Sequence, residues 1–380
     1  MKTDLFVIGI PLETKREEQR VAATPETVKK MQALGCKVIV QKNAGERASI
    51  TDAAYQAAGA EIVSSTEVFK ADLILKVGAP EPNEIKAIKS GTVLIGLLEP
   101  FNQSQLQAMT AQGITAFALE ALPRNSRAQS MDVLSSQANV AGYKAVLLAS
   151  HFYQRFMPML MTAAGTVKAA RVLVLGAGVA GLQAIATAKR LGAVVEASDV
   201  RPAVKQQIES LGAKFLDVPY ETEEEKETAA GVGGYARPMP ASWMARQAAL
   251  VAQRASEADI VISSALIPGR EPPILLHAET VEKMKPGSVI IDMAAGSGKT
   301  GAGNCPLTEA DQVVVKHGVT IVGYTNLPSL VAADASSFYA RNMLEFLKLL
   351  ILEGKFNIPA DDELVSASLM CKDGQLTKNK

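Results

Sequence analysis

The chain of 380 residues lacks the features by which proteins usually hold nucleic acids. Lys plus Arg total 39 and Asp plus Glu also total 39, so the formal net charge is zero. Aromatic residues make up 5% of the chain and include a single Trp. Nucleic-acid-binding proteins attract phosphates with a basic excess and stack bases on aromatic rings. We therefore expect no nucleic-acid partner.

The chain is also poor in cysteine and in long apolar runs. Its three cysteines have no metal-ligand spacing and are odd in number, which indicates a reducing compartment without a disulfide framework or a metal site. No uncharged apolar run reaches the roughly 20 residues that a membrane-spanning helix needs. The apolar run at residues 5–10 is too short for a secretory signal. These absences predict a soluble, cytoplasmic protein.

What is present is an alternation of short apolar runs with amphipathic segments, at 48% hydrophobic and 21% charged residues. This alternation is typical of α/β proteins with parallel sheets. Residues 24–34 predict a helix, because Thr24 can cap its start, Pro25 suits its first position and Gly35 follows its end. Strands are predicted at residues 5–10, 37–41, 73–77, 93–97 and 114–118.

Two long helices are predicted to mark the domain organisation. Apolar residues spaced three and four apart indicate a helix from about Ser130 to Phe156, long enough to bridge two domains. A second α/β unit follows, and residues 332–351 predict another long helix that returns to the first domain. The predicted domains are residues 1–130 with about 328–380, and residues 131–327. Residues 361–376 predict a terminal hairpin that turns at residues 372–374.

Two glycine-rich segments have no helical or strand pattern. Residues 219–240 are rich in Glu and Gly and bracketed by prolines, which predicts a mobile surface loop. Residues 296–300 (GSGKT) resemble the end of a phosphate-binding P-loop. Met293 stands where that motif needs glycine, and no helical pattern follows Thr300. We therefore interpret residues 296–303 as a flexible insertion and not as an ATP site.

The strongest motif follows a buried strand pattern at residues 172–175. Gly176, Gly178 and Gly181 form Gly-x-Gly-x-x-Gly at the start of a predicted helix. In a dinucleotide-binding fold the first glycine permits the tight turn, the second lets the backbone approach a pyrophosphate, and the third lets helix and strand pack closely. The helix N-terminus offers N–H groups to the phosphates. We predict a dinucleotide site here.

The next predicted strand ends at Asp199, 18 residues after Gly181. A carboxylate at this distance is expected to bind the hydroxyl groups of the adenosine ribose. It would repel a 2′-phosphate, so NAD is favoured over NADP. Arg201 is the contrary signal, because a nearby arginine can accept that phosphate.

A second group of polar residues, at 122–137, lies at and before the start of the first long helix. Asp132 and Ser135 are three apart and share one helical face. One interpretation is that Ser130 or Asp132 caps the helix and the arginines are solvated. The other is that these side chains surround a nicotinamide carboxamide and a pyrophosphate. Spacing alone does not decide between the two.

From residues 9–11 and 20–22 through 323–326, the chain resembles the NAD(H)-binding component of proton-translocating nicotinamide nucleotide transhydrogenase. The most specific matches are residues 127–132 (RAQSMD), 161–166 (MTAAGT), 176–181 (GAGVAG), 233–236 (GGYA), 265–269 (ALIPG) and 303–307 (GNCPL). The resemblance implies two Rossmann-like domains joined by long helices, with NAD(H) in the cleft between them. It also implies a homodimer, and partners that hold NADP(H) and span the membrane. Cytoplasmic attachment to the inner face of that membrane is then expected through the partners.

The resemblance also implies the residues of the site. The orienting residues for hydride transfer would be Gln129 and Asp132, and a mobile loop would close over the nucleotide with Tyr235. The full set of expected cofactor contacts is Arg124, Asn125, Ser126, Arg127, Gln129, Asp132, Ser135, Gly176, Gly178, Val179, Gly181, Asp199, Val200, Arg201, Gly234, Tyr235, Ala265 and Leu266. No metal is expected.

Alanine dehydrogenase is the related family that competes with this interpretation. It shares an Arg-Val-Ala opening and a lysine after its third strand, which match Arg20 and Lys76. That family also needs a histidine to handle a substrate proton, and Gly96 stands at the matching position. Glycine cannot act as a general acid or base, so this activity is disfavoured. A module that binds NADH without any chemistry is the remaining alternative.

Overall fold

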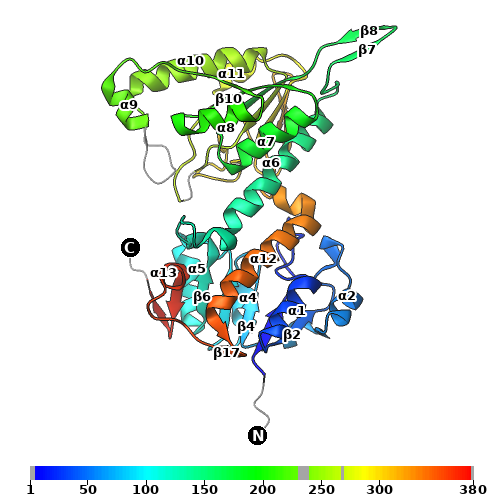
Figure 1. Cartoon of the computed structure of the whole chain (residues 1–380), viewed down its shortest axis with the longest axis vertical. Coiled ribbons are helices and arrows are strands. Elements are labelled where there is room, and N and C mark those ends of the chain that lie inside the picture. The colour runs from blue at the N-terminus through cyan, green and yellow to red at the C-terminus, as the bar shows by residue number, and fades with distance from the viewer. Residues whose placement is uncertain (1–4, 230–238, 267–268, 378–380) are drawn as a thin grey trace. The chain divides into compact units, whose positions relative to one another are not determined.

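The computed structural model describes residues 5–229, 239–266 and 269–377. The chain forms two compact units, Met1–Gln137 with Pro328–Lys380, and Ala138–Leu327 (Figure 1). The sequence predicts the first boundary at residues 130/131, whereas the division falls inside helix α6 (Val133–Phe152). The second division falls just before helix α12 (Ala332–Leu350). The two long predicted helices therefore lie where the chain passes from one unit to the other.

The first unit contains an eight-stranded sheet with the order β19-β18-β6-β5-β4-β1-β2-β3. Six strands from the N-terminal segment are parallel, and β18 and β19 extend the β6 edge in antiparallel fashion. The strands are β1 (Val7–Ile10), β2 (Lys37–Gln41), β3 (Glu61–Val63), β4 (Leu73–Leu75), β5 (Val93–Gly96), β6 (Thr115–Ala118), β18 (Leu369–Lys372) and β19 (Gln375–Leu376). The helices besides α12 are α1 (Pro25–Ala33), α2 (Asp52–Ala57), α3 (Ser65–Val68), α4 (Pro82–Ala87), α5 (Gln103–Ala111) and α13 (Glu363–Ser368).

This sheet is buried on both faces, which explains its nearly uninterrupted apolar strands. In β2, Val38 and Val40 belong to one core cluster with α1 and α12, whereas Ile39 belongs to a second cluster with residues of α4 and α5. Successive strand residues point to opposite faces, so a run of three apolar residues serves two cores. Thr24 caps α1 through its side chain, as the sequence predicts, and Pro25 is the first helical residue.

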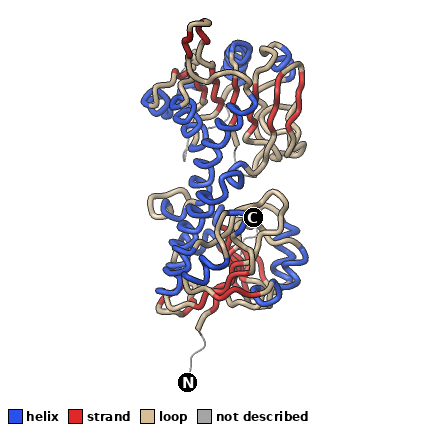
Figure 2. Tube along the Cα trace, turned by 90° about the vertical axis from the view of Figure 1, so that its right-hand side faces the viewer, coloured by secondary structure: helices blue, strands red, loops and turns tan. Residues whose placement is uncertain are grey.

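The second unit contains a seven-stranded sheet with the order β11-β10-β9-β12-β13-β15-β14, parallel except for β14. The strands are β9 (Arg171–Leu175), β10 (Val194–Ser198), β11 (Lys214–Phe215), β12 (Ile260–Ser263), β13 (Val289–Asp292), β14 (Val313–Lys316) and β15 (Val319–Val322). The helices besides α6 are α7 (Val179–Arg190), α8 (Lys205–Ser210), α9 (Glu223–Ala229), α10 (Ala241–Glu257) and α11 (Ala278–Glu282). Figure 2 shows helices on both sides of the strands in each unit. The predicted α/β class with parallel sheets is confirmed.

The chain order of these strands creates a switch point in each sheet. In the second unit, β10 and β11 lie on one side of β9, and the chain then returns to place β12 on the other side. In the first unit, β4 lies beside β1 on the side away from β2 and β3. Open α/β sheets bind ligands beyond the carboxyl ends of the strands at such points. These two edges are therefore where a site is expected.

Two hairpins lie outside the parallel order. Strands β7 (Leu160–Thr162) and β8 (Gly165–Val167) pair only with each other among the described strands and extend from the second unit (Figure 1). The terminal hairpin is formed by β18 and β19, with Asp373 and Gly374 in left-handed conformation at its turn. The sequence predicts the turn correctly but assigns too long a hairpin, because residues 363–368 form α13. Among the described residues, no helix is long and apolar enough to cross a bilayer.

The prediction that residues 219–240 form a loop without a core is wrong for the described segment. Residues 223–229 form α9, and Glu225 has a side chain that is 1% exposed. Its carboxylate accepts hydrogen bonds from Arg246 at 2.8 Å, from Ser242 at 3.0 Å and from the backbone N–H of Glu221 at 2.7 Å. A fully paired acid can be buried, and a run of glutamates does not reveal which of them is paired. Residues 230–238 lie outside the description.

The crossing of α6 and α7 depends on Gly142. A Cβ at this position would lie 2.1 Å from the carbonyl oxygen of Ala180 in α7. Real Cβ atoms do not approach a carbonyl oxygen that closely, so the two helices pack at this distance only without a side chain.

We expect Gly142→Ala to destabilise the protein by about 1–3 kcal/mol through overpacking, although alanine favours an isolated helix over glycine by about 1 kcal/mol. Urea denaturation measures the difference. Asn139→Ala is the matched control, because Asn139 is an exposed residue of the same helix. Equal stability of the two variants would contradict the close crossing.

Candidate dinucleotide site

The turn from β9 into α7 has the geometry that the glycine motif predicts. Gly176 has φ +94°, a left-handed conformation that favours glycine. A Cβ on Gly181 would lie 1.9 Å from the carbonyl oxygen of Gly176, so this position admits no side chain. A Cβ on Gly178 would meet no described heavy atom within 4 Å. The second glycine therefore leaves open space beside the backbone, as approach by a pyrophosphate requires.

The N-terminus of α7 faces this open space. Gly178 is the N-cap residue, and no side chain of the described residues caps the helix. The first N–H groups of a helix have no partner within it, and the helix dipole favours an anion there. Val179, the first helical residue, is 40% exposed. The chain thus presents unpaired donors where the motif places a phosphate.

Asp199 directly follows β10 and is tied to the same turn. Its Oδ2 accepts a hydrogen bond from the backbone N–H of Ala177, with an N–O distance of 2.7 Å. Arg201 also binds this carboxylate, and the side chain of Asp199 is only 6% exposed. Val200 is half-buried between them. The predicted ribose-binding carboxylate therefore lies against the glycine turn, at the carboxyl edge of the second sheet.

Asn304 is a supporting residue that spacing did not single out. Its amide accepts a hydrogen bond from the N–H of Ala265 at 3.1 Å and donates to the carbonyl oxygens of Ala265 and Pro273, both at 2.8 Å. Ala265 and the exposed Leu266 follow β12, next to β9. Ser264 in turn donates to the carbonyl oxygen of Gly176 at 3.0 Å. The β12 loop is thus fixed to the glycine turn on one side and to Asn304 on the other.

Asp292, at the end of β13, anchors the segment that carries Asn304. Its carboxylate accepts from the backbone N–H groups of Ala294, Asn304 and Cys305 at 2.9–3.0 Å, and from the Thr308 hydroxyl at 2.9 Å. Burial raises the pKa of Asp292, although these donors oppose the shift. The acid therefore acts as a structural centre of the loop.

The glycine-rich residues 296–303 do not form a phosphate-binding loop. In the described residues, the next regular elements after Thr300 are the strands β14 and β15, and no helix precedes them. The backbone N–H of Lys299 donates to both oxygens of Glu271, and the N–H of Gly296 donates to the carbonyl oxygen of Gly301. These donors are committed to the chain itself, which agrees with the rejection of an ATP site.

The polar loop before α6 belongs to the first unit. Residues Gln129–Met131 form a 3-10 turn, and α6 begins at Val133. Asp132 accepts hydrogen bonds from the N–H of Ser135 at 2.9 Å and from its hydroxyl at 2.5 Å. Asp132 therefore has the capping contact of the simpler interpretation. Because Asp132 and Ser135 are only half-buried, this contact leaves them accessible.

Two residues of this loop bind the C-terminal segment of the same unit. Arg127 forms an ion pair with Asp362, which also caps α13. The side-chain amide of Asn125 donates to Glu363 at 3.0 Å and accepts from the N–H of Ala128 at 2.9 Å. The structure thus gives both residues a role in holding the loop. Arg124, Ser126 and Gln129 are exposed.

Asn342 in α12 fixes the other side of the loop, and no sequence pattern indicated it. Its amide donates to the carbonyl oxygen of Ser130 and accepts from the hydroxyl of Ser136, both at 2.7 Å. One side chain therefore binds both ends of the segment that contains Asp132. A contact between residues more than 200 positions apart leaves no local signal.

The switch point of the first unit is filled by its own charges. Lys76, after β4, is 1% exposed and binds Glu13 at 3.1 Å and Glu84 at 3.0 Å. Burial alone would lower the pKa of Lys76, but the two carboxylates raise it. Arg20 is similarly bound to Glu18, with Nε and Nη2 at 2.8 and 2.7 Å. These cations are engaged by the protein's own glutamates.

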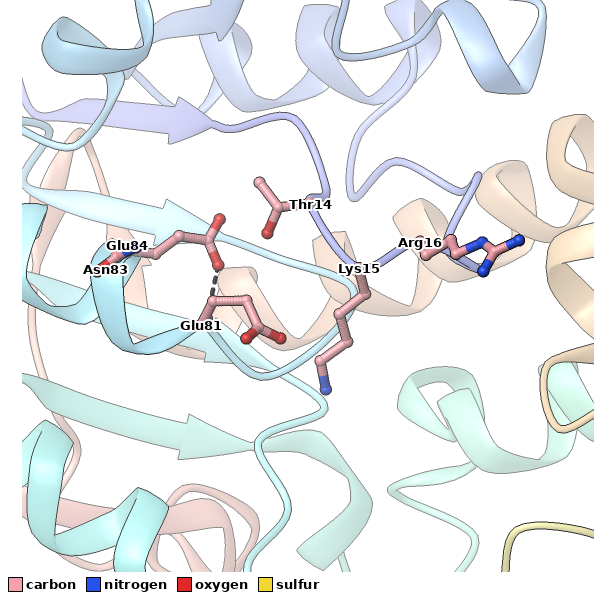
Figure 3. A pocket seen from close by; sticks show the side chains of 6 residues that line it. All are labelled: Thr14, Lys15, Arg16, Glu81, Asn83 and Glu84. Atoms are coloured by element: carbon pink, nitrogen blue, oxygen red, sulfur yellow. Dashed lines mark hydrogen bonds between the residues drawn. The ribbon is translucent and has the colours of Figure 1, made fainter. Parts of the chain in front are cut away.

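A hollow of about 540 Å³ lies at this edge. Figure 3 shows Thr14, Lys15 and Arg16 from the segment after β1 on one side, and Glu81, Asn83 and Glu84 from α4 and its N-cap on the other. The dashed line marks the bond from the N–H of Glu81 to Glu84. None of these residues belongs to the predicted site, and both charge signs are present. The hollow therefore points to no particular ligand.

The predicted residues thus fall into two groups, one in each unit. The glycine turn, Asp199, Arg201 and the β12 loop lie together at the edge of the second sheet. Residues 124–135 lie together before and at the start of α6 in the first unit. Gly234 and Tyr235 lie outside the described residues.

Comparison with known proteins agrees with both units. The alanine dehydrogenase/PNT N-terminal domain model matches residues 9–141, and the C-terminal domain model matches residues 145–379. The chain belongs to the alanine dehydrogenase/PNT family. It is 50% identical to an NAD(P) transhydrogenase subunit alpha protein of Rhodospirillum rubrum, over 97% of each chain.

Solved structures separate the two branches of the alanine dehydrogenase/PNT family. The transhydrogenase of Sinorhizobium meliloti matches with a TM-score of 0.84 and 44% identity, covering 97% of this chain and 98% of that one. An L-alanine dehydrogenase matches with a TM-score of 0.79 and 26% identity, covering 97% and 96%. The predicted relation to transhydrogenase, with alanine dehydrogenase more distant, is confirmed. The chain is a homologue of transhydrogenase alpha subunits.

Glu120 is a buried acid at the carboxyl end of β6, just before the polar loop. Its Oε1 accepts from the N–H of Glu99 at 2.8 Å, and its Oε2 is buried without a hydrogen-bond partner among the described residues. Burial raises the pKa of Glu120 from its ordinary value of 4.5 to about 7. Between these two values the folded state holds a proton that the unfolded chain releases, so stability falls as pH rises through this window.

We expect Glu120→Gln to remove this loss, on the order of 1–3 kcal/mol. The wild-type melting temperature should fall between mildly acidic and mildly alkaline pH by several degrees more than that of the variant. Scanning calorimetry on both sides of the window measures the difference, with Glu46→Gln as a control at an exposed glutamate of the same unit. Parallel pH profiles of wild type and Glu120→Gln would contradict the assignment.

Proposed function

We propose that this chain is the NAD(H)-binding component of a proton-translocating transhydrogenase. It would pass a hydride between NADH held here and NADP⁺ held by a partner component. Proton movement would belong to a separate membrane component, to which this chain attaches from the cytoplasmic side. The relatives named transhydrogenase subunit alpha support a multi-subunit assembly, and a homodimer is included in the proposal.

The observation that carries the proposal is the turn at Gly178. It combines open space beside the backbone with an uncapped helix N-terminus and with Asp199 hydrogen-bonded to the same turn. An anionic pyrophosphate would accept hydrogen bonds from the first N–H groups of α7. Asp199 would accept hydrogen bonds from the ribose hydroxyls. This donor and acceptor set fits a dinucleotide.

The dihydronicotinamide ring of the bound coenzyme supplies the hydride. No side chain has to move a proton in such a transfer, so positioning is what the protein must provide. Gln129, Asp132 and Ser135 would orient the ring. Their own positions are set by the capping bond at Asp132 and by Asn342. This division of labour agrees with the sequence, which has glycine at position 96 in place of a catalytic histidine.

Alanine dehydrogenase activity is disfavoured by the structure around Gly96. A Cβ there would lie 2.7 Å from the carbonyl oxygen of Lys76, so the position has no room for a histidine. Lys76 and Arg20 are bound to glutamates and are not offered to a substrate carboxylate.

The decisive assay mixes the chain with an NADP-binding transhydrogenase component and follows reduction of acetylpyridine NAD by NADPH. We expect turnover only in the mixture. Oxidation of NADH by pyruvate and ammonia, with no partner present, would instead identify an alanine dehydrogenase. Binding of NADH without turnover in the mixture would identify a binding module.

Within this assay, we expect Gln129→Asn to slow hydride transfer by about 10- to 100-fold, because a displacement of about 1 Å is enough for such a loss. The affinity for NADH should change little. Equilibrium fluorescence titration gives the affinity, and stopped-flow mixing gives the rate. Gln107→Asn, at an exposed residue of α5, is the control. Equal loss of affinity and rate would count against an orienting role for Gln129.

A further inference from the structure

Asp199 and Arg201 form an unusually complete pair for residues two positions apart. The backbone N–H and Nε of Arg201 donate to Oδ1 of Asp199 at 2.8 and 2.9 Å. Its Nη2 donates to Oδ2 at 2.9 Å. The two side chains are 6% and 24% exposed, so the pair is largely shielded from water. Both oxygens of the carboxylate are therefore engaged by one residue.

The same carboxylate is held by the glycine turn. Oδ2 also accepts the N–H of Ala177, which lies between Gly176 and Gly178. The guanidinium of Arg201 is thus joined to the glycine motif through a single carboxylate. It lies at the position where the proposed function places the adenosine ribose.

We propose that Arg201 is a latent acceptor for a 2′-phosphate, and that its pairing with Asp199 sets the preference for NAD(H) over NADP(H). The proposal rests on the proposed dinucleotide site. In the native chain the carboxylate acts twice. It repels a 2′-phosphate, and it occupies Nε and Nη2, the two guanidinium donors that bind a phosphate side by side.

Removal of the carboxylate alone should therefore reverse the preference. A guanidinium keeps its charge at any accessible pH, and its planar fork matches phosphate oxygens. No new positive residue has to be introduced, because the chain already carries it. This is a stronger expectation than loss of NADH binding, which any disturbance of the site would cause.

The test measures binding to the isolated chain with two pairs of probes. NADH and NADPH report on the whole coenzyme, and AMP and adenosine 2′,5′-bisphosphate differ only in the 2′-phosphate. For Asp199→Ser we expect NADH to bind about 10-fold more weakly. We expect NADPH and the bisphosphate to bind about 10- to 100-fold more tightly than to wild type, the range for hydrogen bonds to a charged group. Added salt should weaken this gain.

The double variant Asp199→Ser/Arg201→Gln identifies the acceptor. It should lose the gained affinity for the 2′-phosphate, whereas Arg201→Gln alone should keep the wild-type preference for NADH. A gain that survives in the double variant would overturn the role of Arg201. Asp199→Asn is the second test variant, since it retains an acceptor for the N–H of Ala177, and circular dichroism checks that each variant is folded.

The outcomes also separate this inference from the proposed function. If wild type binds neither NADH nor AMP, the dinucleotide site itself is wrong. If wild type binds NADH but neither folded variant at Asp199 gains affinity for the bisphosphate, the latent acceptor is wrong and the dinucleotide site stands.

Discussion

The close approach of backbone to backbone at the β9–α7 turn is the constraint on which the second unit depends. Gly181 would place a Cβ 1.9 Å from the carbonyl oxygen of Gly176, and Gly142 would place one 2.1 Å from that of Ala180. Both contacts bring helices against the turn with no side chain between them. The consequence is an open helix N-terminus at the switch point of a parallel sheet, where donors remain available to an anion.

The first unit has the same type of switch point, but its chemistry is the opposite. Lys76 is surrounded by Glu13 and Glu84, and the β1–α1 segment also pairs Arg20 with Glu18. Removing one partner from such a buried group leaves an uncompensated charge, so the cluster resists opening. Two sheets of similar topology therefore differ in what their edges offer. Topology locates an edge, whereas the side chains there decide whether it can take a ligand.

The sequence was sufficient where the physical rule is local. The strand runs, the capping of α1 by Thr24 and the glycine turn each depend on residues within a few positions, and the structure has them as predicted. Contacts across long separations were not accessible. Asn342 fixes the polar loop from more than 200 residues away, and Glu225 is buried because Arg246 and Ser242 reach it. Composition suggested a loop there because it cannot reveal a paired acid.

The character of the polar loop follows from the chemistry it would serve. A hydride transfer between two nicotinamide rings needs distance and orientation but no proton carrier. Selection would then act on how firmly the loop is held, and the supporting contacts are what the structure provides in number. Arg127 binds Asp362, Asn125 binds Glu363, and Asn342 binds both ends of the turn. A capping aspartate and an orienting aspartate are thus compatible, because the cap is what fixes the carboxylate of Asp132 in one position.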